Sequence, residues 1–294
     1  MRGGEERCSP ATVVVKLGGS VLTDDNAFAR AARFLCERVR RARGESYVAV
    51  VSAQEGWTDS LERTARGIAR FPSPRSLDLL WSTGEIRSVA LLALHLERLG
   101  VRAVGLNVAE TGLRLDEAAG NRIALDSGRL RAELAENEIA VVPGFLGTNA
   151  KGTIVTLGRG GSDLTAVLLA IGLEAARCEL VKDVPGYFSA DPHRDAGAKQ
   201  LPALTFREAL ELADHGCDLV QRNAIEAAAR AGLPVVVHSL QEADLVSIVS
   251  AGGERGVARS ATAGAQGLMP TTVSAHEASD GNALTTIQPK ERRK

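Results

Sequence analysis

A lysine and two glycines follow the first apolar run of the chain and form the first group of residues that could do chemistry. They are Lys16, Gly18 and Gly19, in the sequence KLGGS. Glycines directly after a strand let backbone N–H groups approach an anion without an intervening Cβ, and the lysine adds a mobile positive charge. A tight turn beside a surface lysine has the same sequence. The spacing matches neither G-x-x-x-x-G-K nor G-x-G-x-x-G, so neither of those phosphate-binding loops is indicated.

A second glycine-rich segment, Gly158 to Asp163, directly precedes a long apolar helical pattern. The N-terminus of such a helix presents unpaired N–H groups and the positive end of the helix dipole, which favour a bound anion. Arg159 can hold a carboxylate through two parallel hydrogen bonds. Ser162 or Asp163 could instead simply cap the helix. A cap accounts for one of these side chains but not for an arginine among three glycines, so an anion site is favoured.

A third loop contains a Pro-Gly turn beside aromatic residues, again after an apolar run. It begins at Asp183 and includes Gly186 and Phe188. Such a turn could form the wall of a pocket for a nucleotide base or ribose. Surface turns have the same composition, so this loop alone leaves both interpretations open.

The segments that must position these loops alternate between short apolar runs and longer helical patterns. Strands are predicted at Val13–Leu17, Tyr47–Ser52, Arg102–Leu106, Ile139–Phe145, Ile154–Leu157, Glu179–Val184 and Pro234–His238. Helices are predicted at Asn26–Arg43, Asp59–Arg70, Glu85–Leu99, Asp163–Ala175, Phe206–His215 and Ala224–Ala231. This order predicts an α/β fold with a mostly parallel sheet between helical layers. Ligands of such sheets bind at the carboxyl ends of the strands, where the three loops lie.

The composition limits the classes of partner. The 294 residues include 35 Lys and Arg against 36 Asp and Glu, so net charge gives no reason to expect nucleic acid or an anionic membrane. Neither a membrane span nor a signal peptide is present in the sequence, which predicts a cytoplasmic protein. The four cysteines lack metal-ligand spacing, and no protein metal site is expected.

Domain organisation follows from the distribution of apolar residues. We expect an N-terminal extension at residues 1–10, one catalytic domain at residues 11–250, and a tail at residues 251–294. The tail is rich in Ala, Gly, Ser, Thr and charged residues without an apolar period, so it is expected to be largely disordered.

Five segments together resemble the catalytic domain of aspartate kinases, within the wider amino-acid kinase family. They are VVVKLGGSVL, VVSAQEGWTDSL, STGEIRSVALL, VVPGFLGTNAKGTIVTLGRGGSDLTAVLLA and VKDVPGYFSADP, and they occur in the family's order between Val13 and Ile248. The resemblance implies a three-layer α/β/α sandwich, ATP and Mg²⁺ as cofactors, L-aspartate as phosphoryl acceptor, aspartyl phosphate as product, and a homodimer.

The resemblance also assigns roles position by position. The catalytic lysine corresponds to Lys16, beside Gly18 and Gly19. The residues that contact the acceptor correspond to Ser52, Thr58, Glu85, Arg159 and Ser162, with Asp163 as the catalytic-loop acid. Glu85 would receive the ammonium of the substrate and Arg159 its α-carboxylate. From the residues alone, however, Ser82 and Glu85 fit a capping box at a helix start, and that interpretation is favoured without the resemblance.

The residues at the positions where the family binds the nucleotide depart from the family pattern. The positions that would contact ATP are Lys182, Asp183, Gly186, Phe188, His193 and Arg194. The family usually has a threonine where Lys182 stands, and an ATP-contacting lysine where Asp218 stands. Our hypothesis is that Lys182 restores part of the positive charge lost at Asp218.

Two alternatives stay open. One keeps phosphoryl transfer but changes the acceptor to another small amino acid or carboxylate. The other is a catalytically weak homologue that binds aspartate or a nucleotide, which Asp218 motivates. The family normally continues into ACT domains, and about 45 residues of tail are too few for them, so insensitivity to lysine and threonine is expected.

Overall fold

The computed structural model describes residues 11–42, 44–116, 122–158, 161–192, 194–195, 197–242 and 245–252. Two of the predicted site residues, Arg159 and His193, lie outside these ranges. The predicted N-terminal extension lies outside them too, as does the predicted tail from residue 253 onward.

A mostly parallel sheet forms the centre of the described chain, as the sequence predicted. Its order within these residues is β10-β12-β11-β9-β1-β2-β6-β3. The strands are β1 (Ala11–Leu17), β2 (Glu45–Val51), β3 (Ala103–Gly105), β6 (Ile139–Pro143), β9 (Arg177–Lys182), β10 (Ala203–Thr205), β11 (Val235–Ser239) and β12 (Val246–Ser250). β11 and β12 pair antiparallel, and the other neighbours pair parallel.

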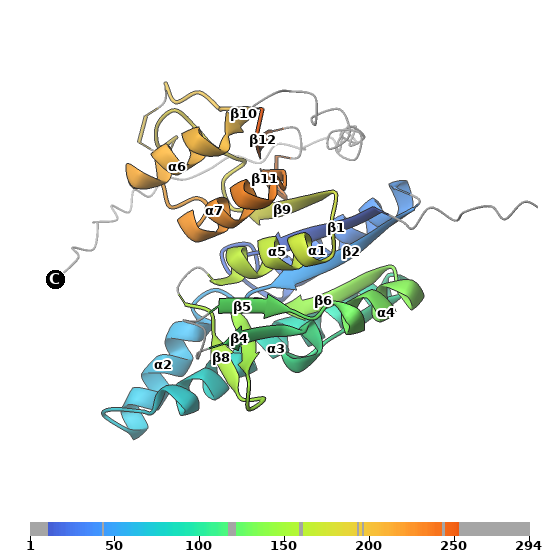
Figure 1. The fold of residues 1–294 in the computed structure, drawn as a ribbon, viewed down its shortest axis with the longest axis vertical. Helices are drawn as coiled ribbons and strands as arrows, with labels where there is room; N and C mark the ends of the chain where they lie inside the picture. The colour runs from blue at the N-terminus through green and yellow to red at the C-terminus, as the bar shows by residue number, and fades with distance from the viewer. Residues whose placement is uncertain are drawn as a thin grey trace, which may run out of the picture.

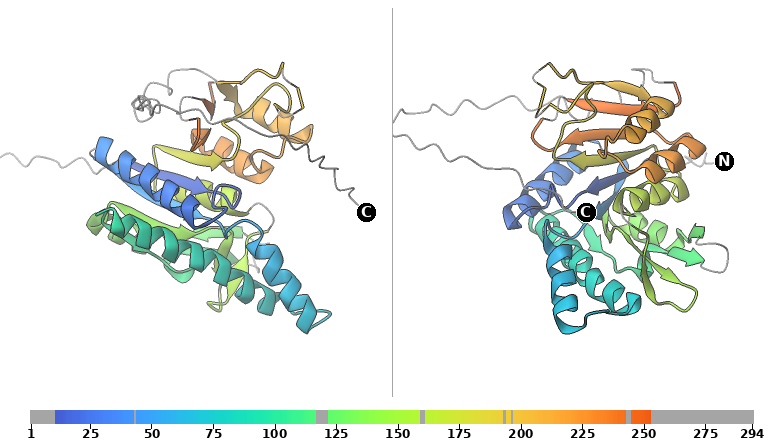
Figure 2. Two further views of the ribbon diagram at one scale, coloured as in Figure 1. Left: turned by 180° about the vertical axis from the view of Figure 1, so that it is seen from behind. Right: turned by 90° about the vertical axis from the view of Figure 1, so that its left-hand side faces the viewer.

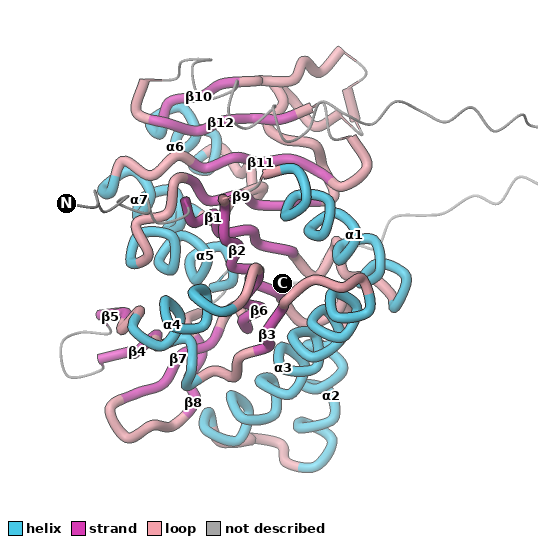
Figure 3. Tube along the Cα trace, turned by 90° about the vertical axis from the view of Figure 1, so that its right-hand side faces the viewer, coloured by secondary structure: helices cyan, strands magenta, loops and turns pink. Residues whose placement is uncertain are grey.

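Helices cover both faces of this sheet, which makes the predicted three-layer sandwich (Figures 1, 2 and 3). One face carries α1 (Asp25–Arg41) and α3 (Pro74–Arg98), and the other carries α4 (Gly128–Glu136), α5 (Gly161–Gly172), α6 (Phe206–Asp214) and α7 (Arg222–Ala231). Side chains of a strand alternate between the faces. Val13 and Val15 of β1 accordingly pack in the core beneath α1 and α3, while Val14 packs in the core with α5 and α7.

A smaller sheet lies at one end of the large one and was mostly missed from the sequence (Figure 1). Its order in the described residues is β5-β4-β7-β8. The strands are β4 (Leu113–Asp116), β5 (Arg122–Leu125), β7 (Leu146–Asn149) and β8 (Ile154–Thr156), and the 3-10 helix η1 (Ala109–Thr111) precedes β4. The predicted strand Ile139–Phe145 was too long, because β6 ends at Pro143 and Phe145 has φ of 68°.

The start of α3 corrects one prediction. The helix begins at Pro74 after the N-cap Ser73, eleven residues before the predicted start at Glu85. Ser82 is therefore inside the helix, where its Oγ donates a hydrogen bond to the Leu79 carbonyl (2.7 Å). The capping-box interpretation of Ser82 and Glu85 is wrong. Together with α2 (Trp57–Ile68), α3 forms a helical hairpin that projects from one end of the molecule (Figure 2).

A buried cluster of charges fixes α1 to the sheet. The Glu179 carboxylate of β9 pairs with Arg38 of α1 (2.6 Å), with Arg177 (2.8 Å) and with His238 of β11 (3.2 Å). Burial disfavours the charged carboxylate, but the surrounding cations hold the pKa of Glu179 well below its usual value. Breaking one member of such a group typically costs about 3–5 kcal/mol, because a buried charge loses its partner.

No helix in the described ranges is long and apolar enough to cross a bilayer.

Candidate active site

Two lysines from neighbouring strands meet on one carboxylate at the start of α5. β1 and β9 are parallel neighbours with Lys16 opposite Leu180, so Lys16 and Lys182 both face α5. The Lys16 ammonium lies 2.9 Å from Oδ1 of Asp163, and the Lys182 ammonium lies 2.8 Å from Oδ2. Lys16 and Asp163 are 7% and 3% exposed. The geometry thus brings the first and second predicted loops together through Asp163.

The electrostatics of this group favour a further anion. Burial works against the charged carboxylate of Asp163, but Lys16 and Lys182 outweigh it and hold the pKa of Asp163 below its usual value. Burial, together with repulsion from Lys16, lowers the pKa of Lys182. Two cations and one anion leave an excess positive charge in a site with little water. An anion that approaches the two lysines would stabilise them both.

Two glycines allow the loops around this group to touch. A Cβ on Gly19 would lie 2.9 Å from the Ala53 carbonyl oxygen, in the loop after β2. A Cβ on Gly144, in the loop after β6, would lie 2.8 Å from the Ser162 hydroxyl. Backbone and hydroxyl atoms at these distances leave no room for a larger residue. The carboxyl ends of β1, β2 and β6 therefore converge on the start of α5.

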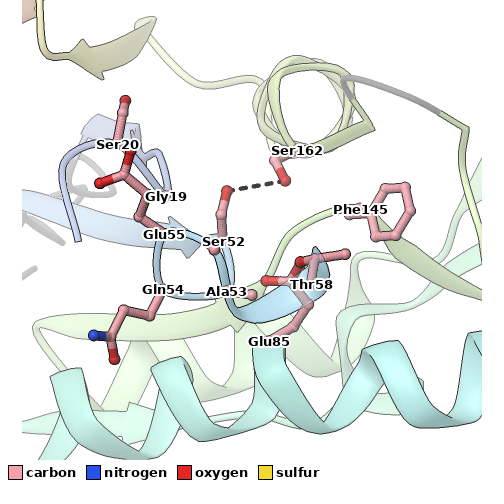
Figure 4. Close-up of a pocket in the computed structure, with 11 residues that line it drawn as sticks. Gly19, Ser20, Ser52, Ala53, Gln54, Glu55, Thr58, Glu85, Phe145 and Ser162 are labelled. Carbon is pink, nitrogen blue, oxygen red and sulfur yellow. Dashed lines mark hydrogen bonds between the residues drawn. The ribbon is translucent and has the colours of Figure 1, made fainter. Parts of the chain in front are cut away.

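A cavity of about 360 Å³ lies where these loops meet. It is lined by Gly19, Ser20, Ser52, Ala53, Gln54, Glu55, Gly56, Thr58, Glu85, Phe145 and Ser162. The Ser52 hydroxyl donates a hydrogen bond to the Ser162 hydroxyl across the cavity (3.1 Å), and Thr58 and Glu85 lie below this pair in Figure 4. Of the residues assigned to the acceptor, the structure brings together Ser52, Thr58, Glu85 and Ser162, whereas Arg159 is outside the described residues.

Glu85 has unusual chemistry for a cavity wall. Its side chain is only 4% exposed, and its Oε2 atom has no hydrogen-bond partner in the part of the chain that the structure describes. Burial raises the pKa of Glu85 to about 8, against smaller opposing effects from the Ala53 backbone and Lys16. A buried carboxyl group with an open acceptor atom is suited to bind a cationic group.

The third predicted loop lines a separate cavity of about 730 Å³, together with the end of α6 and the residues that follow it. Gly186, Phe188 and Arg194 line it, and so does the exposed Asp218. Lys182 and Asp183 do not: Lys182 points to Asp163, and Asp183 accepts a hydrogen bond from the Ser20 hydroxyl (3.3 Å). Of the residues predicted to bind the nucleotide, Gly186, Phe188 and Arg194 thus line this cavity, whereas Lys182 and Asp183 line a different one beside Ser20.

Some residues of the site were not predicted from the sequence. Phe145 lines the smaller cavity, and Gly144 allows the approach of Ser162. The GF pair directly after an apolar strand was the available signal, since the loop after each parallel strand reaches the site edge. Among the described residues no group of three or more His, Cys, Asp and Glu side chains could hold a metal ion.

Several known proteins are similar to this chain in sequence. Residues 11–239 match the model of the Amino acid kinase family. The chain is 38% identical to an aspartokinase of Geobacillus stearothermophilus over 232 residues, which are 78% of this chain and 56% of that protein. It is also 38% identical to an aspartokinase of Pseudomonas aeruginosa over 237 residues, 79% of this chain and 57% of the relative. The chain therefore spans little more than half the length of these relatives.

Solved structures show the same fold. The aspartate kinase of Synechocystis superposes with a TM-score of 0.74 at 36% identity, over 82% of this chain and 40% of that one. The aspartokinase III of E. coli in complex with aspartate and ADP superposes with a TM-score of 0.68 at 28% identity, over 82% of this chain and 64% of that one.

Proposed function

Because the chain belongs to the amino acid kinase family, we propose that it transfers the γ-phosphoryl group of ATP to the side-chain carboxylate of L-aspartate, giving aspartyl phosphate and ADP. One observation carries the proposal. A cavity with a buried carboxyl group, Glu85, and two facing hydroxyl groups lies beside two lysines that share one carboxylate. This arrangement suits an acceptor with an ammonium group next to a polyphosphate. The complex of E. coli aspartokinase III with aspartate and ADP supports both ligands.

The reaction needs charge stabilisation rather than a general base. A carboxyl group with a solution pKa of about 3.9 is already ionised at neutral pH. One carboxylate oxygen of aspartate forms a bond to the γ-phosphorus, and the bond from that phosphorus to the oxygen bridging to the β-phosphate breaks. No proton moves in this step. The obstacle is the approach of two anions and the negative charge spread over the transferring group, which preorganised cations and N–H groups stabilise.

Each assigned residue then has a physical role. Glu85 binds the ammonium of aspartate, and Arg159 binds its α-carboxylate. Ser52, Thr58 and Ser162 orient the acceptor beside the phosphate. Lys16 supplies positive charge at the transferring group, the backbone of Gly18 and Gly19 approaches the phosphate, and Asp163 orders the two lysines.

Mg²⁺ that arrives with ATP would neutralise part of the phosphate charge. The larger cavity, with Gly186, Phe188 and Arg194, is the proposed place for the nucleoside, and Asp183 and His193 complete the proposed nucleotide contacts. A homodimer, which the resemblance implies, and a cytoplasmic location, which the sequence predicts, are part of the proposal.

Lys182 provides a test of how the phosphates are held. It shares Asp163 with Lys16, so its positive charge is available at the proposed phosphate position. In Lys182→Ala the KM for ATP is expected to rise about tenfold or more, because one hydrogen bond from a charged group to phosphate is lost. Steady-state kinetics with varied ATP measure this change. Lys199→Ala, which removes an exposed lysine, is the control, and an unaltered ATP affinity and turnover in Lys182→Ala would contradict the role.

The activity itself is tested with purified protein, MgATP, a panel of amino acids and hydroxylamine, which traps acyl phosphates as hydroxamates. Hydroxamate formation with aspartate alone is the expected result. Hydroxamate with a different acid would instead show another acceptor. No hydroxamate with any acid would favour a binding homologue, the outcome that the acidic Asp218 at the larger cavity motivates.

A further inference from the structure

We propose that Arg87 is a positioning residue, which holds the loop after β2 in the conformation that shapes the acceptor cavity. The inference rests on the proposed function, because it specifies how that same cavity is maintained. Arg87 itself does not line the cavity. It lies on α3 two residues after Glu85, and its guanidinium contacts three residues in two other segments of the chain.

The first two contacts are with the loop itself. Nη1 of Arg87 donates a hydrogen bond to the Gln54 side-chain carbonyl (2.8 Å), and the guanidinium lies over the Trp57 ring, 4.8 Å from its centre. Gln54 and Trp57 stand on either side of Gly56, which has φ of 71°. The loop residues Ser52 to Thr58 supply much of the cavity wall. In Figure 4 the Gln54 side chain is turned away from the Ser52–Ser162 pair.

The contact with Trp57 connects the loop to Glu85. A Cβ on Gly84 would lie 2.9 Å from Cδ1 of Trp57 and 3.1 Å from Cβ of Ala53, so both residues pack directly on the turn of α3 before Glu85. Trp57 is thus in contact with Gly84 on the helix and with Arg87 one turn further along. Holding the ring there keeps Thr58, the next residue, facing Glu85.

The third set of contacts connects the loop after β2, and Arg87 itself, to the segment that follows Gly18 and Gly19. Nε2 of Gln54 donates a hydrogen bond to the Thr23 carbonyl (2.9 Å), and the backbone N–H of Glu55 donates to the Leu22 carbonyl (3.3 Å). The other guanidinium nitrogen of Arg87 lies 3.7 Å from Asp25, at the start of α1. Arg87 therefore joins three parts of the chain: α3, the loop after β2, and the segment that follows Gly18 and Gly19. A planar guanidinium can make this hydrogen bond and this cation–π contact at the same time, which a single ammonium cannot do.

The test compares Arg87→Ala, Arg87→Lys and a matched control, Arg66→Ala. Arg66 is an exposed arginine of α2 that pairs with Glu62 one turn away. In Arg87→Ala the KM for aspartate is expected to rise about tenfold, with the KM for ATP within about twofold of the wild type. Arg87→Lys keeps one contact but not both, so an intermediate KM for aspartate is expected. Arg66→Ala is expected to match the wild type.

A second measurement does not depend on catalysis. Amide hydrogen exchange, followed by mass spectrometry, is expected to speed up in Arg87→Ala over residues 52–58 and to stay unchanged in β1 and β2. Wild-type KM for aspartate and unaltered exchange in a folded Arg87→Ala protein would overturn the inference. A wild-type protein that forms no hydroxamate would refute the proposed function instead, and hydrogen exchange would still decide whether Arg87 holds the loop.

Discussion

Replacing Lys16 with alanine is expected to lower the turnover of aspartate by about 10²–10³, which corresponds to about 2.7–4 kcal/mol of lost transition-state stabilisation. Lys16 is nearly buried and fixed by Asp163, so its ammonium does not have to be reorganised during the reaction. Preorganised charge of this kind acts most strongly where water is excluded. Steady-state hydroxamate formation with saturating ATP and aspartate measures the effect.

The fold is expected to survive this change. Asp163 keeps Lys182 as a partner at 2.8 Å, and the Gln221 backbone N–H also donates to it (3.4 Å), so no buried carboxylate loses all its partners. Thermal unfolding should therefore remain cooperative in Lys16→Ala. Lys151→Ala, at an exposed turn between β7 and β8, is the control and should keep full activity. A folded Lys16→Ala enzyme with wild-type turnover would refute the role of Lys16.

The sequence predicted the central strands of the large sheet because they are mostly apolar, whereas β10 and β12 at its edge were not predicted. A mostly apolar run such as Val13–Leu17 is typical of a strand in a sheet that helices cover on both faces. Most of the strands of the small sheet were missed because they are short and not continuously apolar. β4 and β5 contain charged residues and are only four residues long, so their length does not mark them in the sequence.

The start of α3 shows how a correct local signal can mislead. Ser82 and Glu85 have the spacing of a capping box, but Ser73 and Pro74 provide a competing start at which Ser73 caps the helix. Once the helix runs through residue 82, a serine can satisfy its hydroxyl on a carbonyl of the preceding turn, as Ser82 does. The choice between two local starts depends on packing that the sequence does not display.

The sequence predicted at which edge of the sheet the loops of the site lie. It did not predict which side chains of these loops pair with each other. Parallel strands place their following loops at one edge, which brought Lys16 at the end of β1 and Ser52 after β2 to the same edge, as expected. That Lys182 shares Asp163 with Lys16 depends on which strands are neighbours. β9 lies beside β1 although more than 150 residues separate Lys16 from Lys182 in the chain. The raised pKa of Glu85 depends likewise on burial, which only the assembled fold defines.

The affinity for aspartate is expected to increase with pH up to about 8, the pKa to which burial raises Glu85. Below that pH the free protein holds Glu85 protonated, whereas the ammonium of aspartate favours the ionised form. Binding must then release one proton, and each pH unit below 8 weakens binding by up to about tenfold. The folded protein also keeps Glu85 protonated to a higher pH than the unfolded chain does. The stability that this difference contributes is therefore complete below about pH 4.5 and is lost as the pH rises through 8.

Replacing Glu85 with glutamine tests this coupling, because the amide keeps the shape of the side chain and cannot ionise. Aspartate affinity at pH 8 is expected to fall by about 2–5 kcal/mol, since the buried ammonium loses its charged partner, and the dependence on pH between about 6.5 and 8 should disappear. Glu97→Gln, an exposed change further along α3, should retain the wild-type pH profile. The KM for aspartate at saturating ATP and calorimetric proton release in two buffers both report the coupling. A wild-type KM that is flat over this pH range would contradict the coupling, because a carboxyl group that must lose a proton to receive the ammonium makes the KM depend on pH.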